Sequence, residues 1–304
     1  MEYSRLEQYL ERYIRSPRSI DSYLYEIRRF IDRHPSYATY QHTDITRVFA
    51  DLNEQYRRKD GTLSGAANRI FTAIKWLYSF LVYTGIRKEH PFPPGYSIKG
   101  TKKRGFDRSE VLSPKELRGL VEYSRQDVPY FINLQLRNAV VVSILVHQGL
   151  MSQELVALVC EDIDLDAGTI KIRRTRSTNG RILPLHPSQY MLLNDYLTHS
   201  RAYLLKGNTT CQYLIVGTRA MKETVSGIGS ILRRYRFLYP DKPMTAEAIR
   251  KSVIYNKINE EHRSVEEVQL FAGHKWPSST EAYRSEIDFN DTEFINEVHP
   301  MEVL

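Results

Sequence analysis

Residues 272–283 read AGHKWPSSTEAY, and in this stretch His274 precedes Tyr283 by nine residues. A tyrosine hydroxyl can act as a nucleophile, and a histidine can donate a hydrogen bond to a reacting group. Neither residue type is decisive alone, because the chain holds 21 tyrosines and a lone histidine is more often an ordinary surface or core residue. The interpretation of this stretch therefore depends on the sequence around it.

Three further stretches precede it along the chain. Residues 149–155 read GLMSQEL and are followed by DID at residues 162–164. The segments TIKI (169–172) and RILPL (181–185) read as two strands joined by a polar turn that contains Asn179 and Gly180, which predicts an antiparallel hairpin. Residues 245–252 read TAEAIRKS. Elsewhere after residue 108 the pattern is mostly helical. It predicts a helix that begins after the N-cap Ser113, a helix over about 136–147 and another that begins near Ser152.

The amino-terminal third is predicted to be helical. Apolar residues recur at helical spacing through residues 6–13, 23–31, 48–56 and 68–83, which indicates four or five short helices. We expect Ser19 and Ser64 to cap two of them. The sequence thus predicts a mainly α chain: a helical domain over residues 1–95, a basic linker over 96–108, and an α+β domain with a small antiparallel sheet over 109–304, which includes a carboxyl-terminal tail.

The composition limits the class of protein. A chain of 304 residues with 41% hydrophobic positions is long enough for two globular domains. Its apolar runs are far shorter than a bilayer span, and its first twenty residues lack an export signal, so we expect a cytoplasmic protein without a membrane contact. The two cysteines, Cys160 and Cys211, have no metal-like spacing, and we expect neither a metal ion nor a cofactor.

The positive charge is concentrated at the amino-terminal end. Residues 1–105 hold 19 lysine and arginine residues against 11 acidic ones, whereas the remaining residues hold 24 against 25. This distribution favours a polyanion such as double-stranded DNA as the partner of the first domain and the linker, although a solvated basic surface without a partner would look the same. The candidate DNA-binding residues are Arg69 and Lys75 in a helix, Lys99, Lys102, Lys103 and Arg104 in the linker, and Arg174 in the hairpin turn.

The four stretches, in this order and at these separations, resemble the catalytic domain of the tyrosine recombinase (phage-integrase) family, and the helical domain is similar to that family's core-binding domain. The resemblance implies a site-specific recombinase that cuts and rejoins DNA through a 3′-phosphotyrosyl bond at Tyr283, with four protomers on two duplexes. It also implies that Arg250 and His274 bind the scissile phosphate. The amphipathic tail over residues 288–304 could dock on a neighbouring protomer or pack on its own domain.

The sequence departs from the family pattern at three positions. Met151 stands where the family has its first arginine, and Glu247 stands where it has a histidine. Arg176 stands where the family has the lysine that protonates the leaving oxygen, and arginine is a poor proton donor; Lys171 is a second candidate, and Arg173, Arg174 and Arg176 could serve DNA binding alone. In sequence, His147, Lys251 and Lys275 are the nearest cations that could replace the missing arginine.

These departures leave alternative functions open. Some recombinases of bacterial mobile elements look like this chain, so the departures could be the solution of a subgroup that remains active. The main alternative is a catalytically impaired DNA-binding architectural or regulatory protein on the same fold. A relaxing activity like that of a type IB topoisomerase is a third possibility, which the small integrase-like first domain disfavours.

Overall fold

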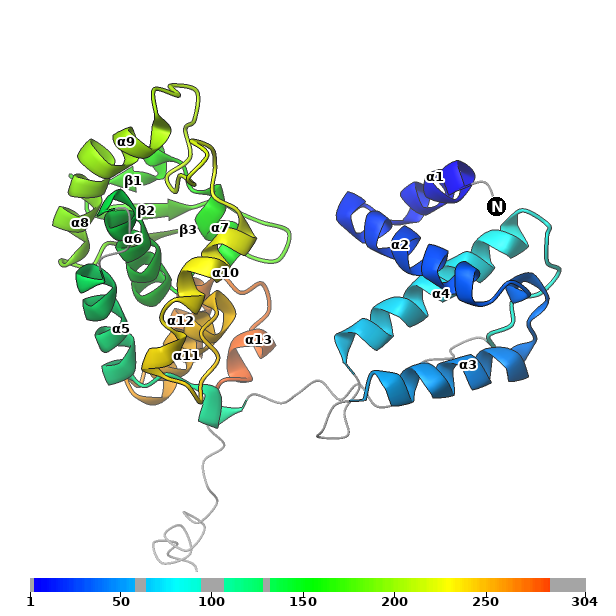
Figure 1. Cartoon of the computed structure of the whole chain (residues 1–304). Coiled ribbons are helices and arrows are strands. Elements are labelled where there is room, and N and C mark those ends of the chain that lie inside the picture. Colours follow the sequence, from blue (N-terminus) through cyan, green and yellow to red (C-terminus); the bar gives the residue numbers. More distant parts are fainter. Residues whose placement is uncertain (1–2, 58–63, 94–106, 128–131, 285–304) are drawn as a thin grey trace, which may run out of the picture. The chain divides into compact units, whose positions relative to one another are not determined.

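Helices predominate in the computed structural model, which describes residues 3–57, 64–93, 107–127 and 132–284 (Figure 1). The chain divides into two compact units, residues 1–105 and 106–304. The division falls inside the stretch predicted to be a linker. The expected mainly α fold with one small antiparallel sheet is confirmed. None of the described helices is both long and apolar enough to cross a bilayer.

The first unit is a set of amphipathic helices packed around α4. Its helices are α1 (Tyr3–Tyr13), α2 (Pro17–Arg33), α3 (His42–Gln55) and α4 (Gly65–Tyr83), with a 3-10 turn η1 (Tyr37–Thr39). The helix α4 contacts the other three α-helices, and Leu10, Ile27, Phe49 and Leu77 are buried between them. Burial of each such side chain contributes about 1.5–3 kcal/mol, so this apolar core holds the unit together.

One predicted cap in this unit is wrong. The helix α2 begins at Pro17, and its N-cap is Ser16, whose side chain accepts a hydrogen bond from the backbone N–H of Ser19. Pro17 explains the difference, since proline is favoured in the first turn of a helix, where its missing N–H costs nothing. The predicted cap at Ser113 is confirmed, since its side chain accepts a hydrogen bond from the backbone N–H of Glu116. Ser64 occupies the N-cap position of α4, but its side chain makes no capping hydrogen bond. The predicted turn at Asp60–Gly61 lies outside the described residues.

The second unit combines helices with a three-stranded sheet. Its α-helices are α5 (Pro114–Gln126), α6 (Ile132–Gln148), α7 (Ser152–Ala157), α8 (Gln189–Asp195), α9 (Arg201–Leu205), α10 (Val225–Arg233), α11 (Ala246–Asn259), α12 (Val265–Ala272) and α13 (Ser278–Glu281). It also contains the 3-10 turns η2 (Arg108–Glu110), η3 (Cys160–Asp162) and η5 (Arg236–Leu238), and the π-helical turn η4 (Tyr196–Ser200). Its strands are β1 (Ile163–Asp164), β2 (Thr169–Ile172) and β3 (Arg181–Pro184), which are antiparallel in the order β1-β2-β3.

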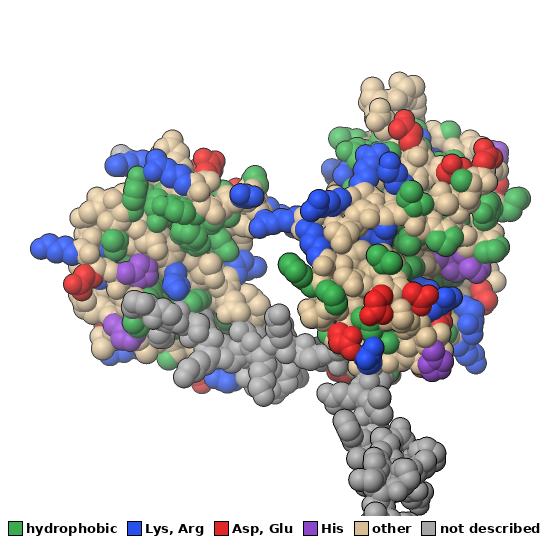
Figure 2. Space-filling view, turned by 180° about the vertical axis from the view of Figure 1, so that it is seen from behind, with side chains coloured by type: hydrophobic (Ala, Val, Ile, Leu, Met, Phe, Trp, Pro, Cys, Tyr) green, Lys and Arg blue, Asp and Glu red, His purple; other side chains and the backbone are tan. Residues whose placement is uncertain are grey.

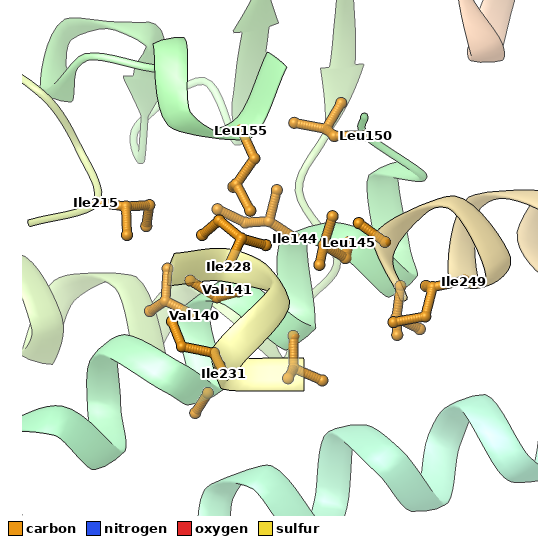
Figure 3. Packing of buried hydrophobic residues seen from close by; sticks show 14 of the residues in the cluster. Val140, Val141, Ile144, Leu145, Leu150, Leu155, Ile215, Ile228, Ile231 and Ile249 are labelled. Atoms are coloured by element: carbon orange, nitrogen blue, oxygen red, sulfur yellow. The ribbon is translucent and has the colours of Figure 1, made fainter. Parts of the chain in front are cut away.

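The helix α6 forms the centre of the second unit. It contacts α5, α7, α8, α9, α10 and α11, and its residues 139–145 are buried (Figure 1). Figure 3 shows Val140, Val141, Ile144 and Leu145 of this helix among apolar side chains from the surrounding elements. Ile249 of α11 belongs to the same cluster. The core therefore fixes the position of α11, and Arg250 follows Ile249 on this helix.

The hairpin of β2 and β3 has one buried face. Ile170 pairs with Leu183, and Ile172 pairs with Arg181, so these four residues lie on the same side of the sheet. Lys171 and Ile182 lie on the opposite, exposed side. Residues 173–180 connect the two strands, and they extend the hairpin toward the turn that follows α12.

Candidate active site

The hairpin connection and the turn after α12 are held together by backbone contacts. Thr178 and His274 form an isolated antiparallel bridge, and the N–H of Asn179 donates a hydrogen bond of 2.8 Å to the carbonyl oxygen of Gly273. Gly273 has φ +68°, and an added Cβ atom would lie 2.8 Å from the Asn179 oxygen and 2.6 Å from Nη1 of Arg181. Glycine is therefore required for this close approach, which brings two distant stretches of the sequence into one site.

Arg250 links three of the stretches. It lies on α11 with its side chain 6% exposed, and its two terminal nitrogens each donate a hydrogen bond of 2.6 Å, to the carbonyl oxygens of Gly149 and Ala272. Burial lowers the pKa of Arg250, and the carboxylate of Glu154, 3.9 Å from Nη1, opposes that shift. The guanidinium is thus fixed in place while it keeps its positive charge, since arginine has a pKa far above neutrality.

A buried ion pair between Arg181 and Glu154 lies beside Arg250. The Glu154 carboxylate accepts hydrogen bonds from Arg181 at 2.7 and 3.1 Å, from the Thr178 hydroxyl at 2.8 Å and from the Met151 backbone N–H at 2.9 Å. Burial acts to raise the pKa of Glu154, but these hydrogen bonds outweigh it and the pKa lies below its ordinary value. The carboxylate is therefore ionised. We did not identify Arg181 as a site residue from the sequence.

His274 and Tyr283 lie next to each other. Their ring centres are 6.3 Å apart and their planes differ by 16°. Nδ1 of His274 shares a hydrogen bond of 2.8 Å with the hydroxyl of Thr280. Burial, together with the charges of Arg250 and Arg181, lowers the pKa of His274 to about 4, so the imidazole is neutral near neutral pH.

Tyr283 follows α13 and packs against a small apolar cluster that includes Ile254, Val268 and Ala272. Burial raises the pKa of its phenol, while Lys251 and Arg250 act to lower it. Tyr283 in turn contributes to the pKa shifts of both cations, which places all three groups within electrostatic reach of one another. The structure thus brings together Tyr283, Arg250 and His274.

The tip of the hairpin lies beside this group. The side chains of Arg174 and Arg176 are exposed, and Arg173 pairs with Asp162 at 3.1 Å. The ammonium group of Lys275 donates a hydrogen bond of 2.5 Å to the backbone oxygen of Arg176. The hairpin tip is therefore attached to the residue that follows His274.

Met151 and Glu247, two of the positions at which we expect a departure from the family pattern, have distinct surroundings. The Sδ atom of Met151 lies 3.9 Å from the hydroxyl of Ser177, so this side chain faces the hairpin tip. Glu247 is exposed on α11 and forms an ion pair of 2.8 Å with Lys251 rather than with Arg250. His147, a candidate replacement cation from the sequence, instead stacks on His186 with ring centres 4.2 Å apart.

The predicted DNA-binding residues are only partly described. Arg69 forms an ion pair of 3.0 Å with the buried Glu26, and the Lys75 ammonium lies 5.6 Å from the centre of the Phe71 ring. Lys99, Lys102, Lys103 and Arg104 lie outside the described residues. Figure 2 shows lysine and arginine side chains spread over both units, with acidic side chains among them. DNA contacts at these positions stay predictions.

No group of three or more histidine, cysteine or acidic side chains within the described ranges could hold a metal ion. The described side chains of the site include the phenol of Tyr283, the imidazole of His274 and the guanidinium of Arg250.

Comparisons with known proteins agree with this geometry. The family model described as "Phage integrase family" matches residues 110–288. The chain is 27% identical over 246 residues to tyrosine recombinase XerC of Roseiflexus castenholzii (strain DSM 13941 / HLO8), covering 80% of this chain and 73% of that protein. It is 22% identical over 250 residues to tyrosine recombinase XerD of Yersinia pestis, covering 81% of this chain and 80% of that protein.

Solved structures share the fold at low sequence identity. XerH site-specific recombinase bound to difH substrate has a TM-score of 0.65 at 17% identity, covering 92% of this chain and 79% of that one. The Tn1549 transposon integrase in complex with circular intermediate DNA has a TM-score of 0.64 at 14% identity, covering 96% and 98%. Because the family model matches more than half of the chain, this protein belongs to the phage integrase family of tyrosine recombinases.

Proposed function

We propose that this chain is a site-specific DNA recombinase, which cuts and rejoins double-stranded DNA through a 3′-phosphotyrosyl bond at Tyr283. The observation that supports the proposal most directly is the convergence of Tyr283, His274 and Arg250 from separate parts of the sequence. The relatives XerC and XerD are tyrosine recombinases, and the solved neighbours XerH and Tn1549 integrase are bound to DNA. We expect the active form to be a tetramer on two duplexes.

Each of these residues has a role in the proposed reaction. The phenol of Tyr283 attacks the scissile phosphorus, and the ester energy is kept in the phosphotyrosyl bond for religation. Arg250 holds nonbridging oxygens of the phosphate with its remaining N–H groups. His274 is neutral near neutral pH, so it donates one hydrogen bond. If the Thr280 hydroxyl donates to Nδ1, the imidazole proton lies on Nε2, where it can reach the phosphate.

The replacements at Met151 and Glu247 reduce the charge available to the transition state. Loss of one donor to a developing oxyanion costs about 2.7–4 kcal/mol, a factor of hundreds in rate. The pairing of Glu247 with Lys251 removes part of the opposing negative charge. We therefore infer a slow but active enzyme, and the second candidate is a DNA-binding protein that has lost the chemistry.

A suicide substrate distinguishes the two candidates. A duplex selected by binding to the full chain from a random-sequence library, and nicked near its centre, should trap a covalent protein–DNA adduct with the wild type. Tyr283→Phe should bind the same duplex equally well and form no adduct. Met151→Arg should form the adduct about 10- to 100-fold faster, whereas Met151→Leu should not. Salt-sensitive binding without any adduct would instead support the architectural or regulatory protein.

A further inference from the structure

The proposed reaction needs a proton donor that the family pattern does not supply in this chain. When the phosphodiester breaks, the departing 5′ oxygen is a strong base unless it is protonated as it leaves. The guanidinium groups of Arg176 and Arg250 are poor donors because arginine holds its protons far above neutrality. Burial keeps the imidazole of His274 in its neutral form. A lysine would suit the role better than any of these.

Lys275 lies at the right place for this role. It follows His274 directly, and its ammonium group reaches the hairpin tip, where it donates a hydrogen bond of 2.5 Å to the backbone oxygen of Arg176. Arg176 is the position at which the resemblance puts a proton-donating lysine. The backbone contacts of Thr178 with His274 and of Asn179 with Gly273 hold the tip against this turn. An ammonium group has three protons, so two remain for another acceptor.

The other lysines near this site are less suitable. Lys251 forms an ion pair with Glu247 at 2.8 Å, and the hydrogen bond that its ammonium group donates to that carboxylate raises the pKa of Lys251. Lys171 lies within β2, on the exposed face, and pairs with Ile182 rather than with a residue of the tip.

We propose that Lys275 is the general acid of the cleavage step, an inference that rests on the proposed recombinase function. The Tyr283 oxygen forms a bond to phosphorus and its phenolic proton passes to solvent. The bond between phosphorus and the 5′ oxygen breaks, its electron pair stays on that oxygen, and a proton moves there from Nζ of Lys275. In religation the 5′ hydroxyl attacks phosphorus and the neutral amine of Lys275 takes its proton back. The bond between phosphorus and the Tyr283 oxygen breaks, its electron pair stays on that oxygen, and the phenolate takes a proton from solvent.

The test compares an oxygen and a sulfur leaving group. Once wild-type cleavage has been mapped on the selected duplex, a second duplex is made with a 5′-bridging phosphorothiolate at the scissile position. Sulfur is a good leaving group without protonation, so loss of a general acid affects only the oxygen substrate. We expect Lys275→Ala to cleave the oxygen substrate about 100- to 1,000-fold more slowly than wild type, and the sulfur substrate within about 10-fold of wild type.

Two further variants separate proton donation from a structural role. Lys275→Arg keeps a cation that can bind the Arg176 oxygen but donates protons poorly. It should therefore cleave the oxygen substrate as slowly as Lys275→Ala does, and the sulfur substrate at a rate close to that of wild type. It also serves as the test protein if Lys275→Ala does not fold. Lys115→Ala, at an exposed lysine of α5, should cleave both substrates at the wild-type rate.

Four outcomes would overturn the proposal. Wild-type rates for Lys275→Ala on the oxygen substrate would show that Lys275 is not needed. Equal losses of cleavage rate on both substrates would show that Lys275 acts through position or charge. Full activity of Lys275→Arg on the oxygen substrate would show the same. Absence of cleavage by the wild-type chain on either substrate would overturn the proposed function as well, and so differs from a failure at Lys275 alone.

Discussion

Gly273 is the residue whose replacement should disturb the site most directly. Its φ of +68° disfavours any residue with a Cβ atom, and that atom would approach the Asn179 oxygen and Arg181 to less than 3.0 Å. Left-handed strain and overpacking together predict that Gly273→Ala lowers the free energy of unfolding by about 2–4 kcal/mol. Urea unfolding followed by circular dichroism would measure the change.

Gly229 supplies the matched control for this substitution. It lies inside α10, and an added Cβ atom meets nothing within 4 Å. Gly229→Ala should therefore leave the unfolding free energy unchanged or raise it by about 0.5–1 kcal/mol through helix propensity. Equal effects of the two substitutions would contradict the requirement for glycine at position 273.

Arg181 shows how far single residues could be predicted. In a strand with alternating faces, Arg181 shares its side with Leu183 and Leu185, and this pattern is the sequence signal that could have indicated a buried arginine in need of an acidic partner. The identity of that partner was not readable, because Glu154 reaches it from a helix distant in sequence. Arg250, His274 and Tyr283 were predicted as a group only through the family resemblance.

At the level of elements, long periodic segments were predicted better than short ones. The strands over 169–172 and 181–185 correspond to β2 and β3, whereas β1 was not predicted because two residues show no period. The helix predicted over 136–147 extends to Ile132–Gln148. Most residues of its buried centre are β-branched or otherwise apolar, and these residues indicate the helix. The positions at which the helix begins and ends are less clearly marked in the sequence.

The ion pair between Glu154 and Arg181 joins the elements α7 and β3, and it should be strongly coupled. Both side chains are almost completely buried, at 0% and 6% exposed. Removal of one partner leaves a buried charge, so Glu154→Gln and Arg181→Met should each lower the unfolding free energy by about 3–5 kcal/mol. The double variant should lose less than the sum, because neither residue of this pair is then left as a charge without its partner.

A double-mutant cycle from urea unfolding gives this coupling. Arg234 and Asp127 form a more exposed pair at 3.1 Å, with side chains 45% and 16% exposed, and serve as the comparison. Their cycle should give a coupling of about 1 kcal/mol or less. Additive losses for Glu154 and Arg181 would mean that the pair does not connect α7 to β3 as we infer.

For the whole molecule, two half-buried histidines predict that the free energy of unfolding depends on pH. Burial lowers the pKa of both His147 and His274 from 6.5 to about 4, with the positive charges of neighbouring groups adding to the shift. Above pH 6.5 both imidazoles are neutral in the folded and the unfolded chain. As the pH falls from 6.5 toward 4, the unfolded chain binds protons that the folded chain does not, so the unfolding free energy decreases.

After allowance for solvent screening, each histidine should account for about 1–2 kcal/mol of this decrease. Urea unfolding of the second unit across this pH range would measure it. His147→Gln and His274→Gln should each flatten the pH profile, whereas His199→Gln, at an exposed histidine in η4, should not. Since DNA would bind the folded chain only, added duplex should raise the unfolding free energy at every pH. A steep pH profile that persisted in the variant lacking both His147 and His274 would place the pH-sensitive groups elsewhere.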